Sequence, residues 1–321
     1  MFSLASSLLL LLPLPLTLAV NLGPTKPIRT RFKNLVTFGD SYTDVVITGD
    51  CGVSWPTYAA GYANLKLFPF ARAGGTCSNN LTFRPFPSVM ETQVPNFVGG
   101  TKNRSIPRLN PAETLYTLWI GTNDVGASAL LSGDGKPGVS VVDTTACAVN
   151  WVKVMYEHGA RNFLFQNMIP LELTPIYSAA GYPNRYWAFE RNATEWSVFM
   201  TELTKSGNAL SKLMLQDLAP RLPGAHIGLF DSHGLFTDMH AHPARYLNGT
   251  APLNVTGSIS ACVFQIQGTL DTAACTTATG TDVDSFLWFD ELHPSEQADR
   301  MVAKAVVEAM AGSRKWTMWL S

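Results

Sequence analysis

The stretch LVTFGDSYTD, residues 35–44, runs from an apolar segment straight into a cluster of polar side chains. Its first residues, Leu35–Phe38, predict a short buried strand. Gly39 ends that strand, and Asp40 and Ser41 follow at once. A turn of this kind can lead from a strand into a helix, with Ser41 as the capping residue. It can equally hold a nucleophile at the carboxyl end of a strand, and the other segments decide between these interpretations.

Other short apolar runs alternate with helical patterns along the chain. The predicted strands are residues 35–38, 65–71, 115–120, 162–168 and 226–231, and the predicted helices are residues 54–65, 141–159, 184–219 (one helix or two) and 295–310. Runs with few polar residues suit strands that are covered on both faces, as in parallel sheets. The sequence therefore predicts an α/β fold, a three-layer α/β/α sandwich around a mainly parallel five-stranded sheet.

The chain has 321 residues and a formal net charge of −1, and lysine and arginine form no cluster. We therefore expect neither nucleic acid nor an anionic membrane surface as a partner. Residues 1–19 contain a short apolar run that is broken by Pro13 and Pro15 and ends in small residues, which predicts a signal peptide. A membrane anchor is the alternative interpretation. Residues 20–321 show no repeat or linker and are predicted to form one catalytic domain, with no membrane partner after cleavage.

Five asparagines stand in Asn-x-Ser/Thr sequons, the acceptor pattern for N-linked glycans. These are Asn80, Asn103, Asn192, Asn248 and Asn254. Together with the leader, they predict a secreted, extracellular glycoprotein.

The five cysteines suggest disulfide bonds, which also suit export. Cys262 and Cys275 bracket a small polar loop and are predicted to form a local disulfide. Cys51 and Cys77 are the next candidate pair, and Cys147, which lies in a helical pattern, is expected to be a buried free thiol. These pairings are hypotheses, because connectivity cannot be deduced from sequence.

The turns after the predicted strands form the candidate site, because ligands of open parallel sheets bind beyond the carboxyl ends of the strands. Ser41 follows the first strand, Gly74–Gly75 follows the second, and Asn123 follows the third. Near the C-terminus, Asp290 and His293 follow the apolar run SFLWF. A hydroxyl, a glycine pair, an amide and a carboxylate–imidazole pair are thus expected at one edge of the sheet.

Acyl transfer needs this set of groups. A serine hydroxyl requires a base to take its proton, and a histidine held by a carboxylate serves that purpose. Backbone N–H groups and a side-chain amide can stabilise the oxyanion that forms, and each donor typically contributes about 3 kcal/mol. The N–H groups of Ser41 and Gly75 and the amide of Asn123 are the predicted donors. Gly74 remains the alternative to Gly75.

Four segments occur in one order along the chain: FGDSYTD, AGGTCSNN, GTND and DELHPS. In this form and order they resemble the blocks of the SGNH, or GDSL-type, hydrolase family, with Tyr42 where the family usually has leucine. The resemblance spans residues 37–295 and implies a flavodoxin-like SGNH hydrolase fold that needs no metal and no cofactor. It implies Ser41 as nucleophile, His293 as base and Asp290 as the residue that orients the base. It also implies Gly75 and Asn123 as oxyanion donors, while Asp40 and Asp124 are interpreted as structural.

Two other groups of residues compete as functional sites. Asp231, Ser232 and His233 follow a predicted strand, but neighbouring side chains point apart, so they do not predict a triad. His240 and His242 can suggest a metal site, but no matching cysteine or carboxylate spacing accompanies them. A surface loop is the preferred interpretation of that segment.

Among the family, the chain is most similar to the secreted fungal acetylesterases of carbohydrate esterase family 16. That resemblance implies a serine esterase that removes acetyl groups from plant cell-wall carbohydrates, with a small-molecule or oligosaccharide ester as substrate. A GDSL-type lipase acting on longer-chain esters is one alternative, and an inactive carbohydrate-binding module is another. Tyr42, Trp55 and Trp288 either form a platform for the sugar at the rim of the site or belong to the core.

Overall fold

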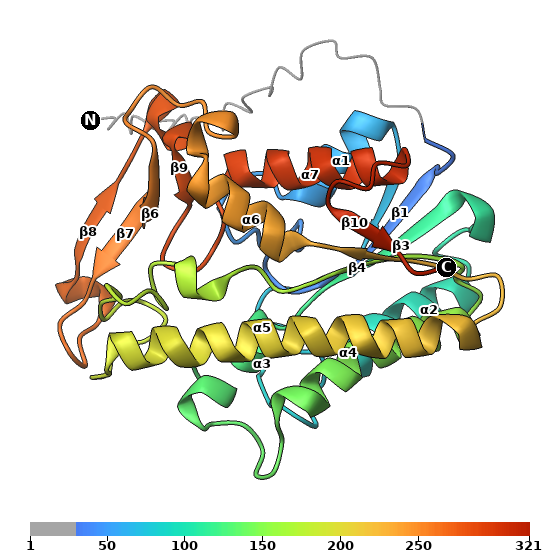
Figure 1. The fold of residues 1–321 in the computed structure, drawn as a ribbon, viewed down its shortest axis with the longest axis horizontal. Helices are drawn as coiled ribbons and strands as arrows, with labels where there is room; N and C mark the ends of the chain where they lie inside the picture. Colours follow the sequence, from blue (N-terminus) through green and yellow to red (C-terminus); the bar gives the residue numbers. More distant parts are fainter. Residues whose placement is uncertain (1–29) are drawn as a thin grey trace, which may run out of the picture.

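A six-stranded sheet forms the centre of the computed structural model, which describes residues 30–321 (Figure 1). The strand order is β10-β5-β4-β3-β1-β2, in which β1 to β5 are parallel and β10 is antiparallel to β5. The strands are β1 (Asn34–Gly39), β2 (Lys66–Pro69), β3 (Thr114–Trp119), β4 (Asn162–Gln166), β5 (His226–Phe230) and β10 (Thr317–Trp319). The five predicted parallel strands are confirmed, and the short C-terminal strand adds a sixth. The predicted signal peptide lies outside the described residues.

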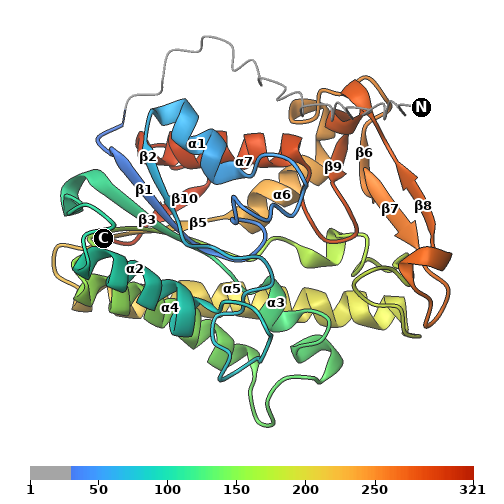
Figure 2. The same ribbon diagram turned by 180° about the vertical axis from the view of Figure 1, so that it is seen from behind.

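Helices cover both faces of the sheet, so the predicted three-layer architecture is confirmed. On one face lie α1, α6 and α7, and on the other lie α2, α4 and α5 (Figures 1 and 2). The helices are α1 (Trp55–Ala63), α2 (Val94–Lys102), α3 (Thr122–Val125), α4 (Val141–Glu157), α5 (Ala193–Leu218), α6 (Ser232–Ala241) and α7 (Glu296–Met310). Within residues 30–321, no helix combines the length and the apolar character needed to cross a membrane.

The alternation of side chains along β1 shows why its sequence is apolar throughout. Leu35 packs into the core beneath α1 and α7, whereas Val36 and Phe38 pack into the core on the side of α4. The central strand β3 divides in the same way, with Leu115 on the first side and Leu118 on the second. Both faces are dry, so both sets of side chains must be hydrophobic.

A small β-rich arm stands at one end of the molecule, to the left in Figure 1. It consists of two pairs of strands, β6 (Asn254–Ser258) with β9 (Phe286–Trp288), and β7 (Ser260–Val263) with β8 (Ala274–Thr277). The predicted disulfide between Cys262 and Cys275 is present and joins β7 to β8. The arm matters for the site because the Asp290–His293 turn follows β9 directly.

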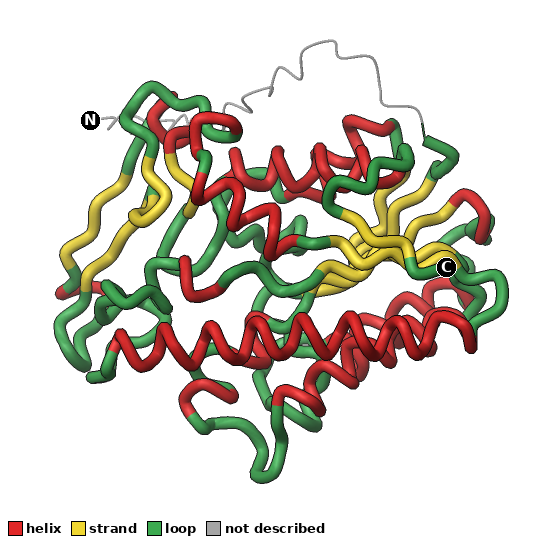
Figure 3. The backbone as a smooth tube through the Cα atoms, viewed as in Figure 1, coloured by secondary structure: helices red, strands yellow, loops and turns green. Residues whose placement is uncertain are grey.

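The region 184–219 differs from its prediction. Only Ala193–Leu218 is α-helical, and the side chain of Asn192 caps this helix by accepting the N–H of Glu195 at 3.2 Å. The preceding segment makes a tight turn, in which Asn184 and Trp187 form an isolated bridge. It belongs to the stretch of loop that leads into the first turn of α5, drawn green in Figure 3. This turn leads the chain back toward the C-terminal part of the site.

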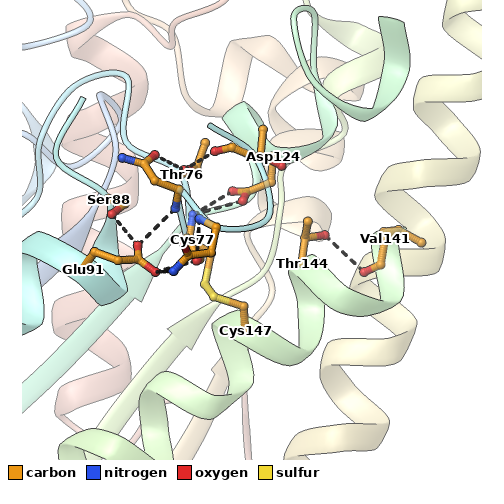
Figure 4. The surroundings of a disulfide bond; sticks show 12 residues. Thr76, Cys77, Ser88, Glu91, Asp124, Val141, Thr144 and Cys147 are labelled. Carbon is orange, nitrogen blue, oxygen red and sulfur yellow. Dashed lines mark hydrogen bonds between the residues drawn. A yellow bond between two sulfur atoms is a disulfide. The ribbon is translucent and has the colours of Figure 1, made fainter. Parts of the chain in front are cut away.

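The second disulfide corrects the sequence prediction. Cys77 bonds to Cys147, whereas Cys51 is free and exposed, so the predicted Cys51–Cys77 pair and the free Cys147 thiol are both wrong. Figure 4 shows the bond joining the loop after the glycine pair to α4. The cause is a non-local contact: α4 packs beside a loop 70 residues earlier in the sequence, which local spacing cannot reveal.

Four of the five sequon asparagines lie at the surface. These are Asn80, Asn103, Asn192 and Asn248. Asn254 is partly buried, and its side-chain oxygen accepts the N–H groups of Thr256 and Gly257.

Candidate active site

The turn after β1 has a backbone that only glycine fits easily. Gly39 has φ +147°, and a Cβ on it would lie 2.2 Å from the carbonyl oxygen of Trp119. The side chain of Gln93 fixes this residue from both sides, since Oε1 accepts the Gly39 N–H and Nε2 donates to the Gly39 carbonyl. The next residue but one is Ser41, which therefore projects from a rigid turn.

The imidazole of His293 lies within hydrogen-bonding distance of both Ser41 and Asp290. Oγ of Ser41 is 2.8 Å from Nε2 of His293, and Nδ1 of the same ring is 3.1 Å from each carboxylate oxygen of Asp290. The hydroxyl comes from the turn after β1 and the other two groups from the turn before α7. Residues 252 positions apart thus meet in the order hydroxyl, imidazole, carboxylate.

The turn Asp290–His293 is held by its own backbone and by a tyrosine of the first block. Oδ1 of Asp290 accepts the backbone N–H groups of Leu292 and His293, both at 2.8 Å. The hydroxyl of Tyr42 donates to the carbonyl of Leu292 at 2.8 Å, and the Tyr42 ring meets the His293 ring edge-on. Tyr42 therefore ties the nucleophile turn to the imidazole turn.

The charges around the imidazole favour a histidine that accepts a proton. Burial opposes a charge on His293, but the Asp290 carboxylate outweighs it, helped by Asp40 and Asp50, so the pKa of His293 is raised above its ordinary value of 6.5. Burial also opposes ionisation of Asp290, yet His293 and the surrounding donors lower its pKa. The pair is thus arranged as a carboxylate beside an imidazole.

On the oxyanion side, the two candidate glycines differ in their hydrogen bonding. The N–H of Gly75 donates to the carbonyl of Arg72 at 3.1 Å, so this predicted donor is already occupied. The backbone N–H groups of Ser41 and Gly74 donate to no acceptor among residues 30–321, and Gly74 has φ +74°, which favours glycine. Gly74, the alternative left open by the sequence, therefore fits the role better than Gly75.

Asn123 lies at the start of α3, directly after β3, with its amide fixed from two directions. Its Nδ2 donates to the carbonyl of Gly75 at 2.9 Å, which leaves its second N–H for a ligand. Its Oδ1 accepts from Arg84 at 3.1 Å, and the same guanidinium donates to the carbonyl of Ala127. Sequence reasoning missed Arg84, because nothing local connects an arginine in a loop to an amide 39 positions later.

Tyr186 is the second residue that sequence reasoning missed. Its hydroxyl donates to Oδ2 of Asp290 at 2.5 Å and lies 3.0 Å from Nδ1 of His293. The residue falls in the turn that the sequence predicted to be helical. A tyrosine in a helical pattern gives no sign of such a contact.

The family profile described as GDSL-like lipase/acylhydrolase matches residues 35–306, which include all the groups described above. The chain belongs to this family. The match covers most of the chain and agrees with the resemblance carried by the four sequence blocks.

Named relatives of this GDSL hydrolase include two acetylesterases. The one from Hypocrea jecorina is 30% identical over 90% of this chain and 92% of its own. The one from Thermothelomyces thermophilus is 23% identical over 92% of this chain and 94% of its own. The family and these relatives show that the chain is a carboxylic ester hydrolase. Among solved structures, a variant of Axe2, an acetyl-xylooligosaccharide esterase from Geobacillus stearothermophilus, is 13% identical with TM-score 0.47, covering 88% of this chain and 95% of its own.

The three aromatic residues considered for a sugar platform of this hydrolase belong to the core. Tyr42, Trp55 and Trp288 are all buried, so the platform interpretation is wrong for each of them. Exposed apolar side chains instead occur on two loops beside the site. Phe83 and Phe86 are 75% and 45% exposed, and the ring of Phe86 lies against Gly74.

A loop of the hydrolase lies directly against the imidazole of His293. A Cβ on Gly49 would be 2.2 Å from Cδ2 of His293, so the backbone there touches the ring and leaves no room for a side chain. On the same loop, Val46 and Ile47 are exposed. The loop therefore covers one side of the His293 ring and carries exposed apolar side chains next to it.

Two buried carboxyl groups lie behind the site of the hydrolase. Burial raises the pKa of Asp40 and of Asp124 to about 7 in each case. Asp40 accepts the backbone N–H of Tyr42, and Asp124 accepts that of Cys77. These contacts fit the structural roles expected for both residues.

The competing groups from the sequence lie elsewhere in the hydrolase. Asp231 caps α6 by accepting the N–H of Gly234, and the Ser232 side chain is buried without a hydrogen-bond partner among the described residues. His240 and His242 lie at the end of α6, where Nδ1 of His242 contacts Asp238. In the part of the chain that the structure describes, no three histidine, cysteine or carboxylate side chains gather as a metal site would require.

Proposed function

We propose that this hydrolase is a secreted serine esterase that works through an acyl-enzyme. The observation that carries the proposal is the contact of 2.8 Å between Oγ of Ser41 and Nε2 of His293, with Asp290 on the other ring nitrogen. Oγ attacks the ester carbonyl carbon while Nε2 takes the hydroxyl proton. Nδ1 keeps its proton toward Asp290, which stabilises the imidazolium.

The oxyanion of the tetrahedral intermediate is received by three donors: the N–H groups of Ser41 and Gly74 and the second amide N–H of Asn123. The intermediate collapses when His293 gives its proton to the leaving alcohol, and the acyl group stays on Ser41. Water then attacks the acyl carbon, with His293 again as base, and a second collapse releases the acid and restores the hydroxyl. No metal ion or cofactor takes part in these steps.

Replacement of Ser41 tests the mechanism. Ser41→Ala should lower kcat on an aryl acetate by several orders of magnitude, because within residues 30–321 no other hydroxyl contacts Nε2 of His293. Thermal unfolding of the variant should match that of the parent chain. Near-normal turnover by a folded Ser41→Ala variant would contradict the proposal.

We further propose acetyl esters of plant cell-wall carbohydrates as the substrate. The names of the two acetylesterase relatives support the acyl group. Phe86, which lies against Gly74, and the nearby exposed Phe83 in the same loop offer apolar surface on which a sugar ring can stack. Export is supported by the leader-like residues 1–19, the exposed sequons and the two disulfides.

A chain-length series of nitrophenyl esters, run beside acetylated xylo-oligosaccharides, tests the substrate. We expect kcat/KM to fall steeply from acetate to octanoate, and the oligosaccharides to release acetate. A rise toward octanoate would instead identify a lipase-like enzyme. Inactivity on every acetylated oligosaccharide, with activity on aryl acetate, would contradict the carbohydrate assignment alone.

A further inference from the structure

The carboxylate of Asp290 receives a hydrogen bond from outside its own turn. Both backbone donors, the N–H groups of Leu292 and His293, contact Oδ1. Oδ2 is contacted by Tyr186, whose hydroxyl lies at 2.5 Å, in addition to the imidazole at 3.1 Å. Tyr186 therefore holds Oδ2 in place and so limits rotation of the Asp290 carboxylate about its Cβ–Cγ bond.

The same hydroxyl also touches the imidazole. The oxygen of Tyr186 is 3.0 Å from Nδ1 of His293, and the two rings meet edge-on. A hydroxyl that donates its proton to Oδ2 still has lone pairs for the proton on Nδ1. Tyr186, Asp290 and His293 thus form a closed triangle of polar contacts, which restricts the ring to one orientation.

The segment around Tyr186 is anchored to the residue next to Asp290. Arg185 forms an ion pair with the buried Glu291, with Nε 3.1 Å from Oε2. Tyr182 donates to Oε1 of the same carboxylate at 3.2 Å, and so does the backbone N–H of Cys262 at 2.5 Å. The two turns therefore contact each other at two successive positions. Arg185 holds Glu291, and Tyr186 holds Asp290.

We propose that Tyr186 is a positioning residue of the esterase, whose phenol holds Asp290 so that His293 keeps the orientation needed to accept the Ser41 proton. This inference rests on the proposed function. Burial, then the neighbouring Asp290 carboxylate, raises the pKa of Tyr186, so the phenol stays protonated and remains a donor at any pH at which the enzyme is assayed. Besides Asp290, the ionisable groups that act on His293 are Asp40 and Asp50, and those that act on Tyr186 are Arg185 and Glu291.

Tyr186→Phe removes the hydroxyl alone. We expect kcat to fall about tenfold because the imidazole loses its fixed orientation, with KM nearly unchanged. Without the phenol, Oδ2 carries more negative charge toward Nδ1, and this charge outweighs the loss of the neutral phenol oxygen as an acceptor for the Nδ1 proton, so the imidazolium is stabilised. The acidic limb of kcat/KM should therefore move up by about half a pH unit.

Tyr182→Phe is the matched control. It removes a phenol from the same segment that contacts Glu291 and not the Asp290–His293 pair, so the acidic limb should stay in place. A second control combines Tyr186→Phe with Asp290→Asn. Because the carboxylate is then absent and only the contact of the phenol with Nδ1 remains, loss of the phenol should lower kcat less than it does beside Asp290.

Two outcomes would overturn the proposal. One is a Tyr186→Phe variant with raised KM and an unmoved acidic limb, which would make Tyr186 a substrate contact. The other is an equal loss of kcat in the Asp290→Asn background. Labelling of the wild-type enzyme by a fluorophosphonate separates the two proposals. If only the role of Tyr186 is wrong, Ser41 still reacts with the probe. If the proposed function is wrong, Ser41 does not react.

Fluorotyrosine placed at position 186 gives an independent measurement, which also serves if Tyr186→Phe does not fold. A fluorinated phenol is more acidic and donates more strongly to Oδ2, so it draws more charge from the carboxylate. The acidic limb should then move down, opposite to its movement in Tyr186→Phe. A limb that stays at the wild-type position would contradict the proposal.

Discussion

The two halves of the active site are held in place in different ways. Ser41, Gly74 and Asn123 follow β1, β2 and β3, which are neighbours in the sheet. The backbone ladder between these strands fixes their three turns relative to one another. The Asp290–His293 turn follows β9, outside the main sheet, and side chains from distant segments hold it, among them Tyr42 and Tyr186. We call the first group, Ser41, Gly74 and Asn123, the ladder half, because the hydrogen bonds of the sheet place it. We call the second group, Asp290 and His293, the side-chain half, because individual side-chain contacts place it.

The largest effect is expected where the two halves meet. His293→Ala removes the base from the side-chain half while the ladder half stays intact. We expect kcat to fall on the order of 10⁴- to 10⁶-fold, as for loss of the nucleophile. Adding Ser41→Ala should cost little more, because the two residues act as one unit. Steady-state and single-turnover assays on an aryl acetate measure both, and additive losses would contradict a shared role.

Within the ladder half, loss of one oxyanion donor should cost less. Asn123→Ala is expected to lower kcat about 10²- to 10³-fold with a smaller change in KM, because the amide acts on the oxyanion and not on the ground state. Asn162→Ala is the matched control. Asn162 also has a buried amide, but it lies at the amino-terminal end of β4, the opposite edge of the sheet from Asn123. The control should lower stability and leave kcat nearly intact. Equal losses of kcat in both variants would make the Asn123 effect merely structural.

The pH profile tests the charge balance of the side-chain half. The pKa of His293 is raised, so kcat/KM should fall as the pH falls through a value above 6.5, where the protonated ring no longer accepts the Ser41 proton. Asp290→Asn removes the charge that opposes burial, so the residual activity of that variant should show its acidic limb at lower pH. An acidic limb that does not respond to Asp290→Asn would show that another group titrates.

The smallest effects on turnover are expected from the disulfides, which act on stability. Cys77→Ala with Cys147→Ala opens a loop with a sequence separation of 70 that braces the ladder half. Cys262→Ala with Cys275→Ala opens one with a separation of 13 in the arm. By chain entropy the first pair should cost about 4 kcal/mol of unfolding free energy and the second about 3 kcal/mol. Denaturant titrations measure both, and a larger loss from the local pair would contradict this ranking.

What the sequence could predict follows the same division. Ser41 and Asn123 follow apolar runs, so the prediction of the strands also places these two residues at the carboxyl edge of the sheet. The choice between Gly74 and Gly75 needed the backbone, because it depends on which N–H is already bonded to Arg72.

The remaining features depend on contacts between distant segments. The Asp290–His293 pair was recognised from its own spacing, whereas Tyr186 was not, since its turn looked like the start of α5. Cys147 was misassigned because its partner lies in a loop far away in the sequence. The antiparallel strand β10 has only three residues, too few to show a periodic pattern.

The proposed role of Ser41 is tested most directly by identifying the serine that reacts with a fluorophosphonate. Such a probe modifies a hydroxyl only where a base and oxyanion donors activate it. We expect a single adduct on Ser41, found by peptide mass spectrometry and strongly reduced in His293→Ala. An adduct on Ser232 or any other serine, with Ser41 unmodified, would contradict it.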